Sequence, residues 1–190
     1  WFPMGLSFLA GKLIREGHEV LIYNGEHDPS LDYVDLTTYS SNYYRYVDAL
    51  QDYTHPSWKK VREILQNFKP DVVGITSFSV KWPSAKRIAA VVKDYNPQIP
   101  VAMGGQHATI MTDDVLSDPN IDFVMRGEGE ETLSEFLIQL SGKQKWEDVA
   151  GLSFKNNGQV IHNSARPLIA QLDDLPFPAR HCLYDVENYA

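Results

Sequence analysis

The sequence predicts an α/β protein: a doubly wound parallel sheet with helices on both faces, then a C-terminal β-hairpin and an extended linker. Three observations support this prediction. Segments with helical periodicity alternate strictly with short apolar segments over residues 4–140. The segment 72–75 is a nearly continuous β-branched run, which is typical of parallel strands buried on both faces. Finally, Asn157-Gly158 separates two short strand-like segments, which indicates a hairpin turn.

The predicted elements follow one another regularly along the chain. Leu6, Leu9, Leu13 and Ile14 recur at helical spacing and predict a helix over 4–15, with Gly17 as its stop. The apolar run 18–23 predicts a buried strand that ends at Asn24-Gly25. Further helices are predicted over 56–67, 83–95, 113–116 and 131–140, and further strands over 71–77, 100–103 and 121–125.

A tyrosine-rich insertion over 26–55 interrupts this order. It has no sustained periodicity beyond a short helix around 43–51. Its tyrosines either pack a loop against the surface or form a lid over a ligand or a docking face. The tyrosines are Tyr33, Tyr39, Tyr43, Tyr44, Tyr46 and Tyr53.

The character of the chain changes after the last predicted helix. We predict a main domain over 1–148 and a hairpin over 149–165. Beyond it, the paired prolines Pro176 and Pro178 and the lack of periodicity predict an extended linker over 166–190. Such a linker is expected to lead to a further domain.

Composition excludes several classes of protein. A hydrophobic content of 43% with 22% charged residues is ordinary for a soluble domain, and no apolar run reaches the roughly 18–20 residues of a membrane span. A formal net charge of -8 argues against a nucleic-acid partner. The single cysteine, Cys182, excludes an internal disulfide and suits a cytoplasmic location. The six histidines lack ligand spacing, so no metal site is predicted.

Functional residues of a doubly wound sheet lie beyond the carboxyl ends of its strands. Those positions fall here at 24–25, 77–80, 104–107 and 126–130. In the segment after 100–103, two consecutive glycines permit positive φ or the close approach of a ligand, although a tight turn beside a packed His107 explains them as well. No Ser-His-Asp or Cys-His arrangement is recognisable, so no catalytic residue is predicted.

The segment 126–130 combines two glycines with backbone amides at a helix start, which suits polar ligand atoms. Its glutamates would repel a phosphate and favour amide or hydroxyl donors. They can equally serve as favourable charges in the first turn of the helix. Neither the Walker lysine loop nor the three-glycine dinucleotide fingerprint is present.

Six segments in this order and spacing resemble the amino-terminal half of cobalamin-dependent radical S-adenosylmethionine (radical SAM) proteins. The resemblance is to the type that includes the anaerobic magnesium-protoporphyrin monomethyl ester oxidative cyclase and assorted methyltransferases, and it covers nearly the whole chain. The segments are Pro3–Leu6, Gly17–Val20, Pro70–Thr76, Gly104–Thr109, Asp122–Glu130 and Leu175–Arg180.

The resemblance implies a Rossmann-like domain that holds cobalamin against the carboxyl edge of its sheet. The family's first strand would precede Pro3, and only Trp1-Phe2 remain of it here. The resemblance implies that the corrin and its nucleotide tail are held by Ser77, Phe78, Ser79, Val80, Gly104, Gly105, Gln106, His107, Thr109, Arg126, Gly127, Glu128, Gly129 and Glu130. The Asp-x-His-x-x-Gly signature is absent, so base-off binding without a histidine ligand to cobalt is expected.

The same resemblance implies a division of labour. The Cys-x-x-x-Cys-x-x-Cys that would hold a [4Fe-4S] cluster and cleave S-adenosylmethionine is absent from this sequence. Both cofactors are therefore expected in a radical SAM domain of the same polypeptide, which would perform methyl transfer or oxidative cyclisation. Two alternatives remain open: a non-catalytic regulatory or protein-docking module, and a free-standing flavodoxin-like enzyme that uses His107 and Glu128 as base and acid.

Overall fold

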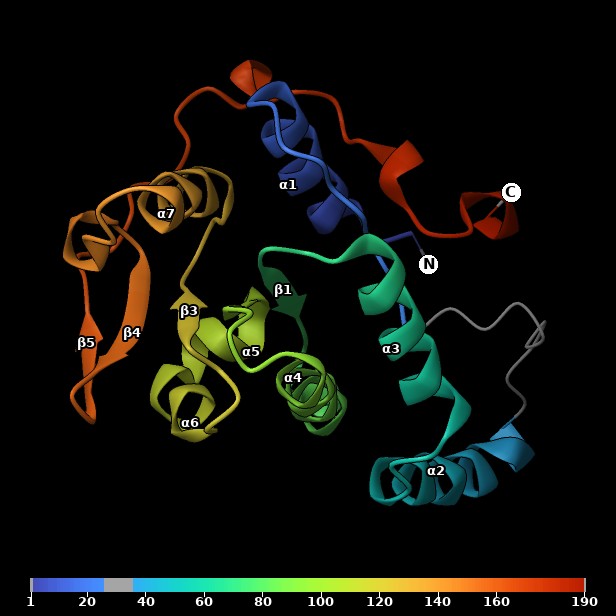
Figure 1. The fold of residues 1–190 in the computed structure, drawn as a ribbon. Coiled ribbons are helices and arrows are strands. Elements are labelled where there is room, and N and C mark those ends of the chain that lie inside the picture. Colours follow the sequence, from blue (N-terminus) through green and yellow to red (C-terminus); the bar gives the residue numbers. More distant parts are fainter. Residues whose placement is uncertain (1, 26–35, 190) are drawn as a thin grey trace.

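The computed structural model describes residues 2–25 and 36–189 and has an α/β fold (Figure 1). Five strands form one sheet in the order β1-β2-β3-β4-β5. The first two pairings join β1, β2 and β3 in parallel, whereas β4 pairs antiparallel with β3 and β5 pairs antiparallel with β4. The predicted parallel core and C-terminal hairpin are thus confirmed. The strands are β1 (Val73–Thr76), β2 (Val101–Gly104), β3 (Phe123–Met125), β4 (Leu152–Asn156) and β5 (Gln159–His162).

Seven α-helices lie in the described ranges, together with short 3₁₀ turns. The helices are α1 (Met4–Arg15), α2 (Leu36–Gln51), α3 (Pro56–Phe68), α4 (Trp82–Tyr95), α5 (Gly105–Ile110), α6 (Thr112–Ser117) and α7 (Glu130–Ser141). None of the described helices is long and apolar enough to cross a membrane. The segment directly after β2, predicted as a loop, instead begins the short helix α5.

Helices cover both faces of the sheet, and the period-two alternation of β2 decides which side chain meets which layer. Val101 and Met103 join the cluster with α3, α4 and α6. Ala102 joins the cluster on the other face, where Phe136 of α7 is fully buried. In Figure 1, α7 lies above the strands and α4 and α6 lie below them.

The hairpin turns where the Asn-Gly pair predicts it. Asn157 and Gly158 have φ of 49° and 81°, as a two-residue turn with two left-handed positions requires. The hairpin does more than follow the sheet, because β4 pairs antiparallel with β3 and thereby extends it. The sheet is therefore mixed, with β1 and β5 at its two edges.

The strand predicted over 18–23 is reduced to a single parallel bridge between Ile22 and Leu183. Ile22 donates to Cys182 O and accepts from Tyr184 N, each at 2.8 Å. Its apolar side chains are accommodated in a third cluster with α1 and the C-terminal segment. The apolar pattern predicted burial correctly, but a pattern does not identify the pairing partner.

The predicted linker is held along α1, where the red segment of Figure 1 passes over the blue helix. We call residues 166–179 the strap. Ala179 N donates to Ser7 O at 2.8 Å, and a guanidinium nitrogen of Arg15 donates to Asp174 O at 2.9 Å. A Cβ atom on Gly11 would lie 2.5 Å from Phe177 O. The strap thus crosses α1 at a position that only glycine permits.

The tyrosine-rich insertion contributes α2, which is longer than the helix predicted around 43–51. Tyr46 accepts a hydrogen bond from Ser84 of α4, and Trp58 of α3 donates to Ala49 O. The tyrosines at 43 and 44 are exposed. Tyr33 lies outside the described residues. The described part of the insertion therefore packs on α3 and α4 and leaves Tyr43 and Tyr44 of α2, and also Tyr53, exposed.

Candidate functional site

The parallel strands β1, β2 and β3 end at one edge of the sheet, so the segments that follow them converge there. The amide of His107 donates to Ser77 O at 3.4 Å, which joins the segments after β2 and β1. The amide of Gly127 donates to Thr109 Oγ1 at 3.0 Å, which joins the segments after β3 and β2. The structure thus brings together three of the four predicted segments. We call the surface formed by 77–80, 104–109 and 126–127 the cradle.

Gly105 is the position where the cradle requires glycine. Its φ is +89°, a left-handed value that side chains disfavour. A Cβ atom there would lie 2.5 Å from Thr76 Oγ1, 3.2 Å from Ser77 O and 3.3 Å from Ser77 N. The residue therefore lets the backbone after β2 lie directly against the end of β1. Gly104 has an extended backbone and no comparable constraint.

Three buried polar atoms of the described residues have no hydrogen-bond partner. They are Ser77 Oγ, His107 Nε2 and Arg126 Nε. Buried polar groups are normally paired, because an unpaired one costs about 1–3 kcal/mol. All three lie in the segments that sequence analysis selected. The cradle therefore holds unused hydrogen-bonding capacity from each of the three strand ends.

His107 is the most buried polar residue of the cradle, with 6% exposure. Its Nδ1 lies 3.0 Å from Ser79 Oγ. The ring lies against the indole of Trp82, with centroids 5.0 Å apart. Trp82 was not among the predicted site residues, although an aromatic residue at the start of α4, just beyond the 77–80 segment, is a signal that could have identified it. The contacts with Ser79 and Trp82 fix the imidazole in place.

Apolar side chains on the same segments face solvent. Phe78 and Val80 are 61% and 77% exposed, and Ile110 at the end of α5 is 77% exposed. Gln106 and Thr109 are exposed polar neighbours. Ile110 was not among the predicted site residues, because it lies one turn beyond the glycine pair. An exposed apolar rim around buried polar atoms is typical of a binding site.

The segment 126–130 has a second side, which faces away from the cradle. Glu128 Oε2 accepts a hydrogen bond from the backbone N–H of Ile169 in the strap at 2.8 Å. A Cβ on Gly129 would lie 3.2 Å from Leu9 of α1. Glu130 begins α7, where a negative charge suits the helix dipole. His107 and Glu128 thus engage different partners, which offers no support for their use as an acid–base pair.

A salt-bridge network joins α1 to α7 beside this segment. The buried Lys12 ammonium lies 2.8 Å from Glu131 and 3.0 Å from Glu16. Burial lowers the pKa of Lys12, but hydrogen bonds to both carboxylates outweigh it and the pKa is raised. Burial likewise raises the pKa of Glu16, but hydrogen bonds from Lys12 and Ser134 outweigh it and the pKa is lowered. The network stabilises the charged forms of these groups.

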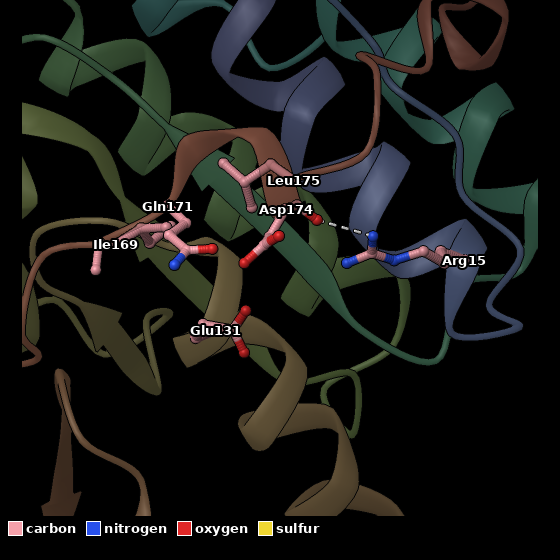
Figure 2. Close-up of a pocket in the computed structure, with 7 residues that line it drawn as sticks. Arg15, Glu131, Ile169, Gln171, Asp174 and Leu175 are labelled. Carbon is pink, nitrogen blue, oxygen red and sulfur yellow. Dashed lines mark hydrogen bonds between the residues drawn. The ribbon is translucent and has the colours of Figure 1, made fainter.

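A hollow of about 340 Å³ lies between this network and the strap. Figure 2 shows Glu131 at the start of α7, Arg15 on α1, and Gln171 and Asp174 of the strap around it. The dashed line marks the Arg15 hydrogen bond to Asp174 O. None of the fourteen predicted site residues lines this hollow. It is therefore distinct from the cradle.

Comparison with protein families gives a match to the B12 binding domain over residues 1–137. An uncharacterised methyltransferase of Pyrococcus horikoshii is 33% identical over 93% of this chain and 33% of its own length. Cytidylyl-2-hydroxyethylphosphonate methyltransferase of Streptomyces wedmorensis is 28% identical over 99% of this chain and 38% of its own. The anaerobic magnesium-protoporphyrin IX monomethyl ester cyclase of Cereibacter sphaeroides is 28% identical over 92% and 25%. The chain thus spans between a quarter and two fifths of these relatives.

Solved structures agree on the fold. The radical SAM methyltransferase TsrM from Kitasatospora setae, with cobalamin and a [4Fe-4S] cluster bound, has a TM-score of 0.62 at 18% identity. That likeness covers 94% of this chain and 29% of TsrM. The cobalamin-dependent radical enzyme OxsB has a TM-score of 0.57 at 20% identity, over 64% of this chain and 17% of its own. The chain belongs to the B12 binding domain family, and it is related to the cobalamin-dependent radical SAM methyltransferases and the magnesium-protoporphyrin cyclases.

Proposed function

We propose that this chain is the cobalamin-binding domain of a radical SAM enzyme that performs methyl transfer or oxidative cyclisation on a small organic substrate. In this proposal the chain is not catalytic by itself and supplies the cradle for cobalamin. The observation that carries the proposal is the set of three buried, unpartnered polar atoms, Ser77 Oγ, His107 Nε2 and Arg126 Nε. They belong to the segments that follow three neighbouring parallel strands.

The chemistry of the cradle fits cobalamin. The corrin ring carries amide side chains, and its nucleotide tail carries a ribose and a phosphodiester. The Ser77 hydroxyl can donate or accept, and Arg126 Nε can donate to an amide or phosphate oxygen. The missing side chain at Gly105 lets a bulky group lie close to the backbone. Phe78 and Val80 offer apolar surface to the ring.

Each residue of the cradle has a distinct task in this proposal. His107 is held by Ser79 through Nδ1, so the direction of its buried, unpartnered Nε2 is fixed. In this proposal a polar group of the cofactor reaches that atom. The chain lacks the Asp-x-His-x-x-Gly signature. In this proposal cobalamin would therefore bind base-off, without a protein nitrogen ligand to cobalt. When bound, cobalamin supplies a cobalt centre that can accept a methyl group and pass it on. The rest of the candidate set shapes the edge around these groups.

The proposal assigns the remaining chemistry to another part of the polypeptide. S-adenosylmethionine and a [4Fe-4S] cluster would bind a radical SAM domain, since this sequence lacks the cysteine motif. The relatives are about three times as long as the region they share with this chain, which leaves room for such a domain. In the proposed division, 1–148 holds the cofactor, 149–165 is the hairpin and 166–190 leads onward. The enzyme is proposed to be cytoplasmic.

A titration of the purified protein with hydroxocobalamin tests the proposal, followed by visible absorption and gel filtration. We expect co-elution of cobalamin with a base-off spectrum, and loss of both in Gly105→Leu. Gly17→Leu is the matched control, since Gly17 also has a positive φ, +92°, but nothing lies within 4 Å of the position of its Cβ. Retention by the control and loss in Gly105→Leu supports the cradle. Absence of binding by the unchanged protein refutes the proposal.

The alternative is a regulatory or protein-docking module with the same fold. It is favoured by the two exposed tyrosines of α2, Tyr43 and Tyr44, which are 60% and 68% exposed. Large exposed aromatic side chains are enriched where proteins meet. This alternative takes precedence if the protein retains no cobalamin. In that case a Tyr43→Ser, Tyr44→Ser double variant should lose its partner without loss of stability.

A further inference from the structure

The loop from Arg126 to Glu130 contacts the cradle on one side and the strap on the other. On the cradle side, Gly127 N donates to Thr109 Oγ1 at 3.0 Å. The guanidinium of Arg126 donates to Asn163 O, just after the hairpin. On the strap side, Glu128 Oε2 accepts from Ile169 N at 2.8 Å. A single five-residue loop thus connects the proposed cofactor site with the segment that leaves the sheet.

The strap is held by polar contacts more than by a core of its own. Its beginning is fixed by Arg166, which donates to Thr132 Oγ1 at 2.8 Å and pairs with Glu135. Three of its large apolar side chains face solvent: Leu168, Leu172 and Phe177 are 81%, 67% and 95% exposed. Ile169 and Leu175 are half-buried. Because little apolar area is buried by the strap itself, its docking depends on a few individual hydrogen bonds. The Glu128 bond is one of them.

The loop from Arg126 to Glu130 loses backbone conformational entropy when it becomes ordered. Glu128 lies between Gly127, whose φ is +75°, and Gly129. Glycine loses more backbone conformational entropy on ordering than any other residue. Ordering the unliganded loop so that Glu128 can bind Ile169 N therefore costs free energy. A ligand that binds Arg126 and Gly127 would already have ordered the loop before the strap docks. The strap would then dock at a smaller cost, which is positive coupling between the two events.

We propose that Glu128 couples occupancy of the cradle to docking of the strap, so that bound cobalamin tightens the segment leading to the rest of the polypeptide. This inference rests on the proposed function, because the ligand of the cradle is taken to be cobalamin. Glu128 is here a positioning residue. Its carboxylate accepts the hydrogen bond from Ile169 N of the strap. Glu128 would therefore link binding in the cradle to docking of the strap.

Coupling of this kind is reciprocal, because each of the two events changes the equilibrium constant of the other by the same factor. If cobalamin favours the docked strap by a given factor, then undocking the strap must weaken cobalamin binding by up to that same factor. A substitution that disturbs docking of the strap but lies far from the cradle therefore tests the coupling. Gly11→Ala places a Cβ 2.5 Å from Phe177 O, whereas Gly5→Ala in the same helix meets nothing within 4 Å.

The experiment is hydrogen exchange at the Ile169 amide, with and without hydroxocobalamin, while binding is followed by visible absorption. Cobalamin should slow this exchange by about tenfold, which lies within the usual range of coupling between two sites. Glu128→Ala should abolish the response, and Glu128→Gln, which keeps an acceptor oxygen, should preserve most of it. Asp114→Asn on α6 changes the net charge equally and should behave as the unchanged protein.

Gly11→Ala should weaken cobalamin binding by up to the same factor, and Gly5→Ala should not.

The outcomes separate this inference from the proposed function. If the visible spectrum reports binding but Ile169 exchange does not change, the coupling is refuted and the cofactor assignment stands. If Glu128→Ala retains the full response, Glu128 is not the coupling residue and the inference fails. If Glu128→Ala also loosens the α7 amides, Glu128 acts as an ordinary helix-start residue and the inference fails. If no cobalamin binds, both proposals fall together.

Discussion

Replacing Gly105 with alanine is the most informative single change in the cradle. Two separate costs arise at this position. The residue has a φ of +89°, and a left-handed backbone costs a side-chain-bearing residue about 1–2 kcal/mol. The new Cβ would also lie 2.5 Å from Thr76 Oγ1, with two backbone atoms of Ser77 within 3.3 Å. Overpacking of this kind typically adds about 1–3 kcal/mol.

The expected total is therefore about 2–5 kcal/mol of lost unfolding free energy. Gly17→Ala separates the two costs, because Gly17 has a φ of +92° but no atom within 4 Å of its Cβ position. It should lose only about 1–2 kcal/mol, and the difference between the variants measures the close approach. Urea unfolding followed by circular dichroism gives both values.

Cofactor binding provides a second readout for the same pair of variants. The strain at Gly105 must be relieved by moving the backbone of Ser77, which carries one of the unpartnered cradle atoms. Gly105→Ala should therefore lose affinity for hydroxocobalamin, and Gly17→Ala should keep it. Equal urea midpoints and equal affinities for the two variants would refute the reasoning about the cradle.

Three further predictions concern α1. Lys12→Met removes the cation between Glu16 and Glu131 and should cost about 1–3 kcal/mol in urea unfolding, with an unchanged midpoint as the contrary result. Because the fold lowers the pKa of Glu16, its stabilisation is present above the ordinary pKa of 4.5 and is lost as the pH falls through the lower folded value. Glu16→Gln should remove part of the acid sensitivity of the urea midpoint, and identical pH profiles would contradict this. Gly11→Ala should speed chymotryptic cleavage after the exposed Leu172 of the strap, whereas Gly5→Ala should not, and equal rates would show that the close approach is unimportant.

Much of the fold could be predicted because local pattern and tertiary role agree. The helix predicted over 4–15 is α1 itself, and the β-branched run after Asp71 became β1. The Asn157-Gly158 pair fixed the hairpin turn by its own backbone preference. These signals are contained within a few residues, so the sequence alone is sufficient to find them.

Contacts between distant segments were not predictable. Gly11 gave no sign that Phe177 would cross above it, since an interior helical glycine has many explanations. The bridge between Ile22 and Leu183 joins two apolar segments whose partner no periodicity specifies. The strap similarly looked like a free linker, because its prolines describe local conformation and not where the segment docks.

The candidate site was predictable in position but not in detail. The rule for parallel sheets places functional residues after the strands, and three of the four segments so chosen converge. That rule cannot tell which side of a loop a side chain faces. Glu128 was assigned to the cofactor, yet its carboxylate meets the strap. Trp82 lies against His107 and was missed because it falls between the predicted 77–80 segment and the helix predicted over 83–95.

The most direct test is a crystal structure of the protein with hydroxocobalamin bound. We predict that the corrin or its nucleotide tail lies at the carboxyl edge of the sheet and takes hydrogen bonds from Ser77, His107 and Arg126. Cobalamin seated instead in the hollow between Arg15 and Asp174, with the three cradle atoms still unpartnered, would contradict the assignment.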